Sequence, residues 1–169
     1  MEIVKYIILL LILACSTYIG ILMSKKYLNR VKELKEIKTA LNIFKTKVEY
    51  MHEPLSEIFV DISERTSSNI SNIFKKASQN MEKLDAGIAW NKSIDSIQTN
   101  LNKEDVDVIK GLGHLLGKVN VEGQVSQINL IDNFLDVQIE KAEEKRKKNE
   151  KLYKTLGTTI GLAIVIILI

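Results

Sequence analysis

Both ends of the chain carry long segments without a charged residue. Residues 6–24 (YIILLLILACSTYIGILMS) are 19 consecutive residues that include no Asp, Glu, Lys or Arg. An α-helix rises about 1.5 Å per residue, so this segment covers roughly the 30 Å of hydrocarbon in a bilayer. Residues 155–169 (TLGTTIGLAIVIILI) have the same character over 15 residues. We therefore predict that the membrane holds the chain at both ends.

The amino-terminal segment is best explained by a retained transmembrane helix over residues 1–24. A cleaved signal peptide has a shorter apolar region, followed by small residues at a cleavage site. Here the apolar residues continue through Ile21, Leu22 and Met23. A lipoprotein anchor at Cys15 is an alternative, because Leu-Ala-Cys occurs at 13–15, although the residues before it are bulkier than that signal usually allows. Cys15 is the only cysteine, so no internal disulfide forms.

Basic residues follow the first apolar segment and precede the second one. Outside the segment 24–154, Lys5 is the only basic residue. The positive-inside rule therefore places residues 24–154 in the cytoplasm, with both ends pointing out. The carboxyl-terminal segment, 155–169, would reach only about 22 Å as a helix. We predict a short membrane anchor there and leave open whether it crosses the bilayer. The flanking basic residues are Lys25, Lys26, Arg30, Lys32 and Lys35, then Lys141, Lys145, Arg146, Lys147, Lys148, Lys151 and Lys154.

Contacts with anionic lipids explain these basic residues better than nucleic-acid binding does, because no aromatic or glycine pattern accompanies them. The segment between them is acidic. Residues 39–140 contain 10 basic and 15 acidic side chains, a net charge of −5.

Residues 25–154 are predicted to form one domain, a helical bundle of about five to six helices, so the fold class is all-α. Apolar residues recur there at steps of three and four, as in amphipathic helices. Pro54 is expected to break or kink the first helix and to begin the next. Asn102 is a predicted N-cap, Gly117 a predicted helix end, and Asn120 a candidate cap of the last helix. The first and last helices are expected to be continuous with the anchors. The clearest apolar series is Leu34, Ile37, Leu41, Phe44, Val48, Met51, Leu55, Ile58 and Ile62.

Small residues at matching spacing indicate how the two anchors could pack. Gly157 and Gly161 lie four residues apart in the tail, and Ser16 and Gly20 have the same spacing in the first segment. Such pairs let membrane helices approach closely. In an antiparallel hairpin both pairs would face each other toward the cytoplasmic side. Chance is the alternative, because glycine is common in membrane helices.

The sequence contains no pattern typical of an active site, so we predict a protein that is not an enzyme and needs no cofactor or metal. His52 and His114 are expected on separate helices, without metal-binding spacing. The glycines of GLGHLLG at 111–117 do not stand between a strand and a helix, as a phosphate loop would require. Close helix packing and a helix end explain them better.

One acidic pattern stands out. Glu49, Glu53, Glu57 and Asp61 follow each other at intervals of four, with Glu64 just beyond. On a continuous helix they would form an acidic ridge, although Pro54 is expected to tilt its two halves apart. Like charges at this spacing are mildly destabilising. A solvated helix face is one interpretation, and a surface that steers a basic cytoplasmic partner is the other.

Several segments of the chain resemble the stage III sporulation protein AB family of endospore-forming bacteria. They are VEYMHEPLSEIF at 48–59, AGIAWNKSI at 86–94, GLGHLLGKVNVEGQVSQI at 111–128, and KAEEKRKKNEKLYKTLGTTIGLAIVIILI at 141–169. The likeness covers essentially the whole chain. Its most specific part is the order of the LG-x(5)-GQ segment, the charged helix, LYKTLG and the hydrophobic end. Gly123 departs from it, where a polar or acidic residue is expected before Gln124.

This resemblance implies a role in the secretion-like channel between mother cell and forespore during engulfment. The soluble part is similar to the helical F-domain of type II secretion and type IV pilus platform proteins. By that analogy it faces the mother-cell cytoplasm and docks a cytoplasmic ATPase and other channel subunits. The resemblance leaves open whether the chain also forms a homo-oligomer. Fold-level analogy is an association and not a mechanism. A membrane-bound helical signalling protein and a lipoprotein anchored at Cys15 are the alternatives.

Overall fold

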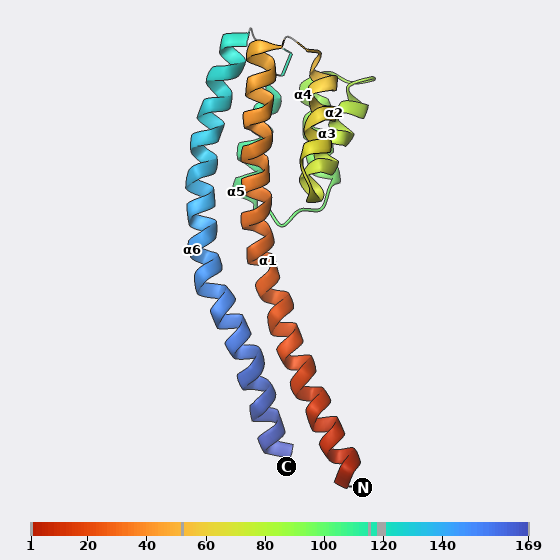
Figure 1. Ribbon diagram of the computed structural model, residues 1–169, viewed down its shortest axis with the longest axis vertical. Coiled ribbons are helices and arrows are strands. Elements are labelled where there is room, and N and C mark those ends of the chain that lie inside the picture. Colours follow the sequence, from red (N-terminus) through yellow and green to blue (C-terminus); the bar gives the residue numbers. More distant parts are fainter. Residues whose placement is uncertain (1, 52, 115, 118–120, 169) are drawn as a thin grey trace. The chain divides into compact units, whose positions relative to one another are not determined.

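The computed structural model describes residues 2–51, 53–114, 116–117 and 121–168. The predicted all-α fold is confirmed, since these residues form six α-helices and one short 3₁₀ helix (Figure 1). His52 and Asn120, named above as a histidine and a candidate cap, lie outside the described residues. The elements are α1 (Glu2–Tyr50), α2 (Leu55–Arg65), α3 (Ser68–Asn80), α4 (Ala86–Ser96), α5 (Lys103–Lys110), the 3₁₀ helix η1 (Gly111–His114) and α6 (Val121–Leu168).

The first and last helices are far longer than the others. The helix α1 has 49 residues and α6 has 48, and each contains a stretch long and apolar enough to cross a membrane by length and composition. The prediction of a short carboxyl-terminal membrane helix is wrong, because residues 155–168 are the end of one helix that begins at Val121. No proline interrupts this stretch, and ion pairs at i,i+4 support its charged part. The expected continuity of the two apolar end segments with the first and last helices is confirmed.

The chain divides into two compact units. The first unit consists of Met1–Val31 and Lys141–Ile169, and the second of Lys32–Glu140. Each of the two long helices therefore contributes one part to each unit.

In the first unit, the amino-terminal part of α1 and the carboxyl-terminal part of α6 run side by side, so that α1 begins where α6 ends (Figure 1). The Ser16 hydroxyl donates a hydrogen bond of 2.6 Å to the carbonyl oxygen of Gly157. The rings of Tyr27 and Tyr153 stack with their centroids 5.9 Å apart. The unit is an antiparallel helical hairpin that exposes large apolar side chains toward the two ends of the chain, such as Leu10, Ile160 and Ile167.

The second unit is built around four aromatic side chains. The Phe59 ring meets Phe44, Phe74 and Trp90 at centroid distances of 5.6, 5.2 and 5.5 Å, all edge-on. Edge-to-face contacts of this kind stabilise a core beyond the area that they bury. The indole Nε1 of Trp90 donates to the carbonyl oxygen of Ile109 at 2.9 Å, which satisfies the only polar atom of a side chain that is 1% exposed.

Around this cluster, α2 packs on α3 and α3 packs on α4. The predicted apolar series is buried at five positions of α1 and at Ile58 and Ile62 of α2, but Met51 is 55% exposed. Met51 falls out of the series because α1 ends at Tyr50 and the chain turns before α2. The five buried positions of α1 are Leu34, Ile37, Leu41, Phe44 and Val48.

The segments between α4 and α6 are held by local hydrogen bonds and by close backbone packing. Asn102 caps α5 as predicted, in a reciprocal capping box with Asp105. A Cβ atom built on Gly87 would lie 2.0 Å from the carbonyl oxygen of Gly113, so these two backbones touch where only glycine fits. Gly117 has a φ of 72°, in the left-handed region that glycine adopts readily, but the helix predicted to end there stops earlier, since α5 ends at Lys110 and η1 at His114.

Candidate functional site

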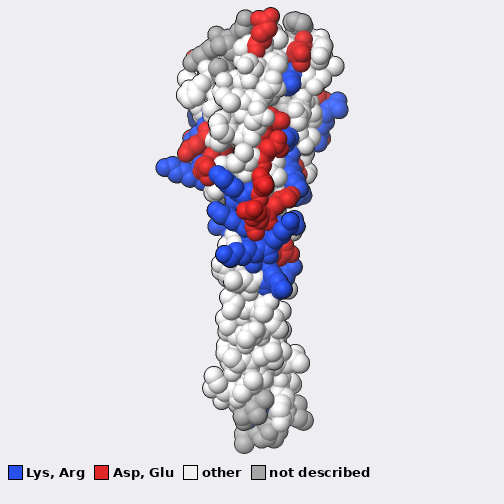
Figure 2. Space-filling view, turned by 90° about the vertical axis from the view of Figure 1, so that its left-hand side faces the viewer, with Lys and Arg blue, Asp and Glu red and all other residues white. Residues whose placement is uncertain are grey.

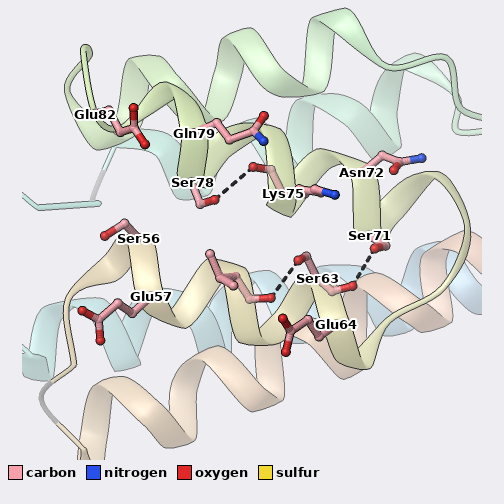
Figure 3. Close-up of a pocket in the computed structure, with 11 residues that line it drawn as sticks. Ser56, Glu57, Ser63, Glu64, Ser71, Asn72, Lys75, Ser78, Gln79 and Glu82 are labelled. Atoms are coloured by element: carbon pink, nitrogen blue, oxygen red, sulfur yellow. Dashed lines mark hydrogen bonds between the residues drawn. The ribbon is translucent and has the colours of Figure 1, made fainter.

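A groove with a volume of about 530 Å³ lies between α2 and α3 (Figure 3). Four serines line it, with three carboxylates and one lysine among the other lining side chains. The serines are Ser56, Ser63, Ser71 and Ser78, and the charged residues are Glu57, Glu64, Lys75 and Glu82. Glu57 and Glu64 come from α2, Lys75 from α3, and Glu82 from the turn that follows α3.

The serine hydroxyl groups hold the groove together. The Ser71 hydroxyl on α3 donates 2.6 Å to the carbonyl oxygen of Ser63 on α2, which links the two helices directly. The hydroxyl groups of Ser63 and Ser78 donate to carbonyl oxygens within their own helices, at Val60 and Lys75. These three hydroxyl groups are therefore satisfied inside the protein.

The three groove carboxylates are exposed to solvent. Within the described part of the chain, neither Glu57, Glu64 nor Glu82 forms an ion pair, in contrast to the carboxylates nearby. With Lys75 as the one cation of the lining, the groove carries a net charge of −2. A concave surface lined mainly by one sign of charge focuses its field on approaching molecules of the opposite sign.

The predicted acidic ridge is distributed over three elements. Glu49 lies in the last turn of α1, Glu53 lies between α1 and α2, and Glu57 and Asp61 lie on α2. The chain turn after Tyr50 separates them, so they do not follow one another along a single helix. Glu57 faces the groove, whereas Glu53 and Asp61 converge on a lysine of α1.

That lysine is Lys47. Its Nζ lies 2.8 Å from a carboxylate oxygen of Glu53 and 3.4 Å from one of Asp61, while Arg65 donates to both oxygens of Asp61 at 2.9 Å. The hydrogen bond from Arg65 lowers the pKa of Asp61, and the hydrogen bond to Glu53 raises the pKa of Lys47. Through Lys47, Asp61 fastens α2 to α1 and Glu53 fastens the segment between these helices to α1, and the charge of both carboxylates is largely compensated within the protein.

The groove contains one acidic residue that the spacing along the sequence does not indicate. Glu82 stands 18 positions after Glu64 and joins it only because α2 and α3 pack together. A periodicity argument along one helix has no means of finding such a neighbour. Glu64, by contrast, follows the ridge directly in the sequence.

In the hairpin unit, the structure brings the four predicted small residues together. A Cβ atom built on Gly157 would lie 3.1 Å from the Cα of Gly20, and one on Gly161 would lie 3.1 Å from the Cβ of Ser16. Cys15, beside this contact, is exposed.

His114, which the sequence analysis considered as a metal ligand, lies in η1 and is exposed to solvent. Across the residues that the structure describes, no three His, Cys, Asp or Glu side chains come close enough together to hold a metal ion.

Comparison with known proteins gives consistent results. The model of the family Stage III sporulation protein AB (spore_III_AB) matches residues 5–169. The Stage III sporulation protein AB of Bacillus subtilis (strain 168) is 28% identical over 161 residues, which cover 93% of this chain and 94% of the relative. A solved structure of Stage III sporulation protein AB (SpoIIIAB) matches with a TM-score of 0.65 at 23% identity, covers 71% of this chain and 98% of its own, and supports the fold alone. The chain belongs to the Stage III sporulation protein AB family and is a sporulation protein.

Proposed function

We propose that this protein is a non-catalytic platform of the secretion-like channel between mother cell and forespore. Its two long apolar helices would anchor it in the mother-cell membrane that surrounds the forespore, with the helical domain in the cytoplasm. There it would dock the cytoplasmic ATPase of the channel and other channel subunits. The predicted division into a first span at 1–24, a domain at 25–154 and an anchor at 155–169 is part of this proposal.

The observation that carries the proposal is the acidic groove between α2 and α3. A docking surface needs charged groups that are available to a partner, and those of Glu57, Glu64 and Glu82 are exposed and lack an ion pair within the described chain. Of the four ridge residues, Glu57 lines this groove, and Glu49 is exposed near the end of α1. Glu53 and Asp61 form ion pairs with Lys47. We therefore assign the partner contact to Glu57 with Glu64 and Glu82, and a structural role to Glu53 and Asp61.

Uncompensated charges at the edge of an interface mainly raise the association rate and select the partner. A basic segment of the ATPase, or of another channel subunit, is the occupant that this groove fits by charge. Such docking would weaken with rising salt, because exposed charges are screened over about 10 Å at 0.1 M ionic strength.

The test is co-purification of the channel ATPase with the tagged full-length chain from sporulating cells. The variant Glu64→Lys/Glu82→Lys reverses two groove charges without removing an internal ion pair. The matched control, Asp107→Lys/Glu140→Lys, makes the same charge change at exposed positions of α5 and α6. We expect the groove variant to lose the ATPase and the control to retain it. Equal recovery with both variants would remove the groove from the proposal.

A further inference from the structure

Three lysines of α6 in the hairpin unit stand shortly before the uncharged segment that follows Lys154. Lys147, Lys148 and Lys151 are all exposed, and no charged residue follows Lys154. Figure 2 shows Lys and Arg side chains gathered at the border of this uncharged part. In a membrane-anchored helix, this border lies at the level of the lipid headgroups.

Glu150, which is adjacent to Lys151 in the sequence, is already occupied. Glu150 binds Lys154 at 2.7 Å and also faces Arg146, whose Nε lies 3.7 Å from its second oxygen. Among the described residues, no carboxylate pairs with Lys147, Lys148 or Lys151. Lys151 is four residues from Lys147 and three from Lys148, so the three ammonium groups share one helix face and repel one another. An anion bound between them would relieve this repulsion.

A shallow hollow of about 400 Å³ lies on the same face. The three lysines line it together with Leu152, Thr155 and Leu156, which belong to the next turn of α6. Lysine side chains can lay their methylene stems along such an apolar surface and keep their charged ends in water. The face thus presents cationic groups on the cytoplasmic side and apolar groups on the membrane side. An anionic phospholipid has the complementary order, with a charged headgroup above acyl chains.

We propose that this face of α6 is a binding site for one anionic phospholipid. Its phosphate lies between the ammonium groups of Lys148 and Lys151, with Lys147 at the edge, and the first part of an acyl chain lies along Leu152 and Leu156. The site rests on the membrane anchoring proposed above. This site differs from a general attraction to an anionic membrane, because its residues lie on one face of one helix.

The other basic residues at this border provide a matched comparison. Lys25 and Lys26 of α1 belong to the same unit and are also exposed, but they do not line the hollow. A diffuse electrostatic attraction depends on the number of lysines near the surface and not on which helix carries them. The double variants Lys148→Gln/Lys151→Gln and Lys25→Gln/Lys26→Gln remove equal charge, and only the first removes the site.

The experiment uses the full chain in neutral detergent micelles, titrated with phosphatidylglycerol that carries a fluorescent acyl chain, and binding is followed by anisotropy. Phosphatidylcholine with the same label is the zwitterionic comparison. Membrane anchoring is measured separately, as retention of the chain in membranes washed with alkaline carbonate. A chain that the wash extracts would contradict the anchoring itself, whatever the result of the lipid titration.

We expect the parent chain to bind phosphatidylglycerol in preference to phosphatidylcholine. Lys148→Gln/Lys151→Gln should weaken this binding at least tenfold, since each lysine near an anionic surface contributes about fivefold. The Lys25→Gln/Lys26→Gln variant should stay within about threefold of the parent chain. Equal losses in the two variants would overturn the proposal in favour of diffuse attraction. Soluble glycerol phosphate that displaced the lipid at the same concentration as the lipid would also overturn it, because the acyl chain would then contribute nothing to binding.

Discussion

The backbones of Gly20 and Gly157 meet in the hairpin unit at a distance that excludes side chains. A Cβ atom on Gly20 would lie 2.6 Å from the carbonyl oxygen of Tyr153, and one on Gly157 would lie 2.9 Å from the carbonyl oxygen of Ser16. Helices in a lipid environment gain no hydrophobic energy from association, so they depend on this kind of close packing. In the membrane proposed for this hairpin, the contact between these glycines would hold the two apolar helices together.

Replacement of Gly157 by leucine should separate the two helices of the hairpin. The reporter is a pair of cysteines, Leu13→Cys and Gly161→Cys, in a chain that carries Cys15→Ala. A Cβ atom at Gly161 lies 3.4 Å from the Cα of Leu13, so these two positions are in direct contact across the hairpin. We expect oxidation in membranes to link this pair in the parent chain and several-fold less in Gly157→Leu, as measured by gel shift with PEG-maleimide.

The control for this variant is Ala163→Leu, which adds a large side chain at an exposed position of the same helix. It should leave the disulfide yield unchanged. The same yield in all three chains would show that the glycines do not hold the hairpin.

Glu33 is a buried carboxylate that fastens the segment before α5 to α1. It accepts hydrogen bonds from the backbone nitrogen and the side-chain amide of Asn100, at 2.7 and 2.8 Å, and is 3% exposed. Glu33→Gln replaces one acceptor by a donor and should lower the free energy of unfolding by about 1.5–3 kcal/mol. Urea unfolding of the full chain in detergent, followed by fluorescence of the single Trp90, measures the loss. Glu140→Gln, at an exposed site, should stay close to the parent; a Glu33→Gln chain as stable as the parent would contradict this role.

The capping box at the start of α5 should contribute measurably to stability. Asn102 accepts from the backbone nitrogen of Asp105 at 2.8 Å, and the Asp105 carboxylate accepts from the backbone nitrogen of Asn102 at 2.9 Å. Asn102→Ala should therefore cost about 1 kcal/mol in the same unfolding measurement. Asn129→Ala, at an exposed position within α6, removes no cap and serves as the comparison. A loss of the same size in both variants would argue against a capping effect.

The ion pairs of Lys47 predict a loss of stability at alkaline pH. Its hydrogen bond to Glu53 raises the pKa of Lys47 in the folded chain above the value near 10.4 that an unfolded chain has. The stabilisation is therefore fully present below pH of about 10.4 and is lost as the pH rises through the folded pKa. We expect the stability advantage of the parent chain over Lys47→Met to be constant from pH 7 to 9 and to disappear at higher pH. An advantage that persisted above the folded pKa would show that packing, and not charge, is responsible.

Much of the fold follows from periodicity and from single residues with strong local preferences. The apolar series in α1 and α2, the N-cap at Asn102 and the continuity of both long helices are confirmed by the structure. The 3.6-residue repeat is a property of the sequence itself, so it can be found without knowledge of the contacts. The carboxyl-terminal membrane helix was wrongly described as short, because hydropathy marks only the apolar residues 155–169, whereas hydrogen bonding along α6 begins at Val121.

The candidate site was less accessible from the sequence. The repeat of acidic residues at intervals of four includes Glu53 and Asp61, which the turn after Tyr50 brings onto Lys47. It omits Glu82, which only the packing of α3 on α2 brings to Glu57 and Glu64. Which carboxylates stay available for a partner depends on contacts between helices. The sequence pattern along one helix does not reveal such contacts.

The central claim is that the helical domain lies in the compartment that holds the ATPase, and the most direct measurement is labelling at an exposed position of that domain. Lys92 on α4 is exposed, so Lys92→Cys in a Cys15→Ala chain presents a single accessible thiol there. A maleimide that cannot cross membranes should leave this thiol unlabelled in intact cells and should label it once the cells are opened. Labelling of intact cells to the same extent as opened cells would place the domain outside and contradict the proposed docking.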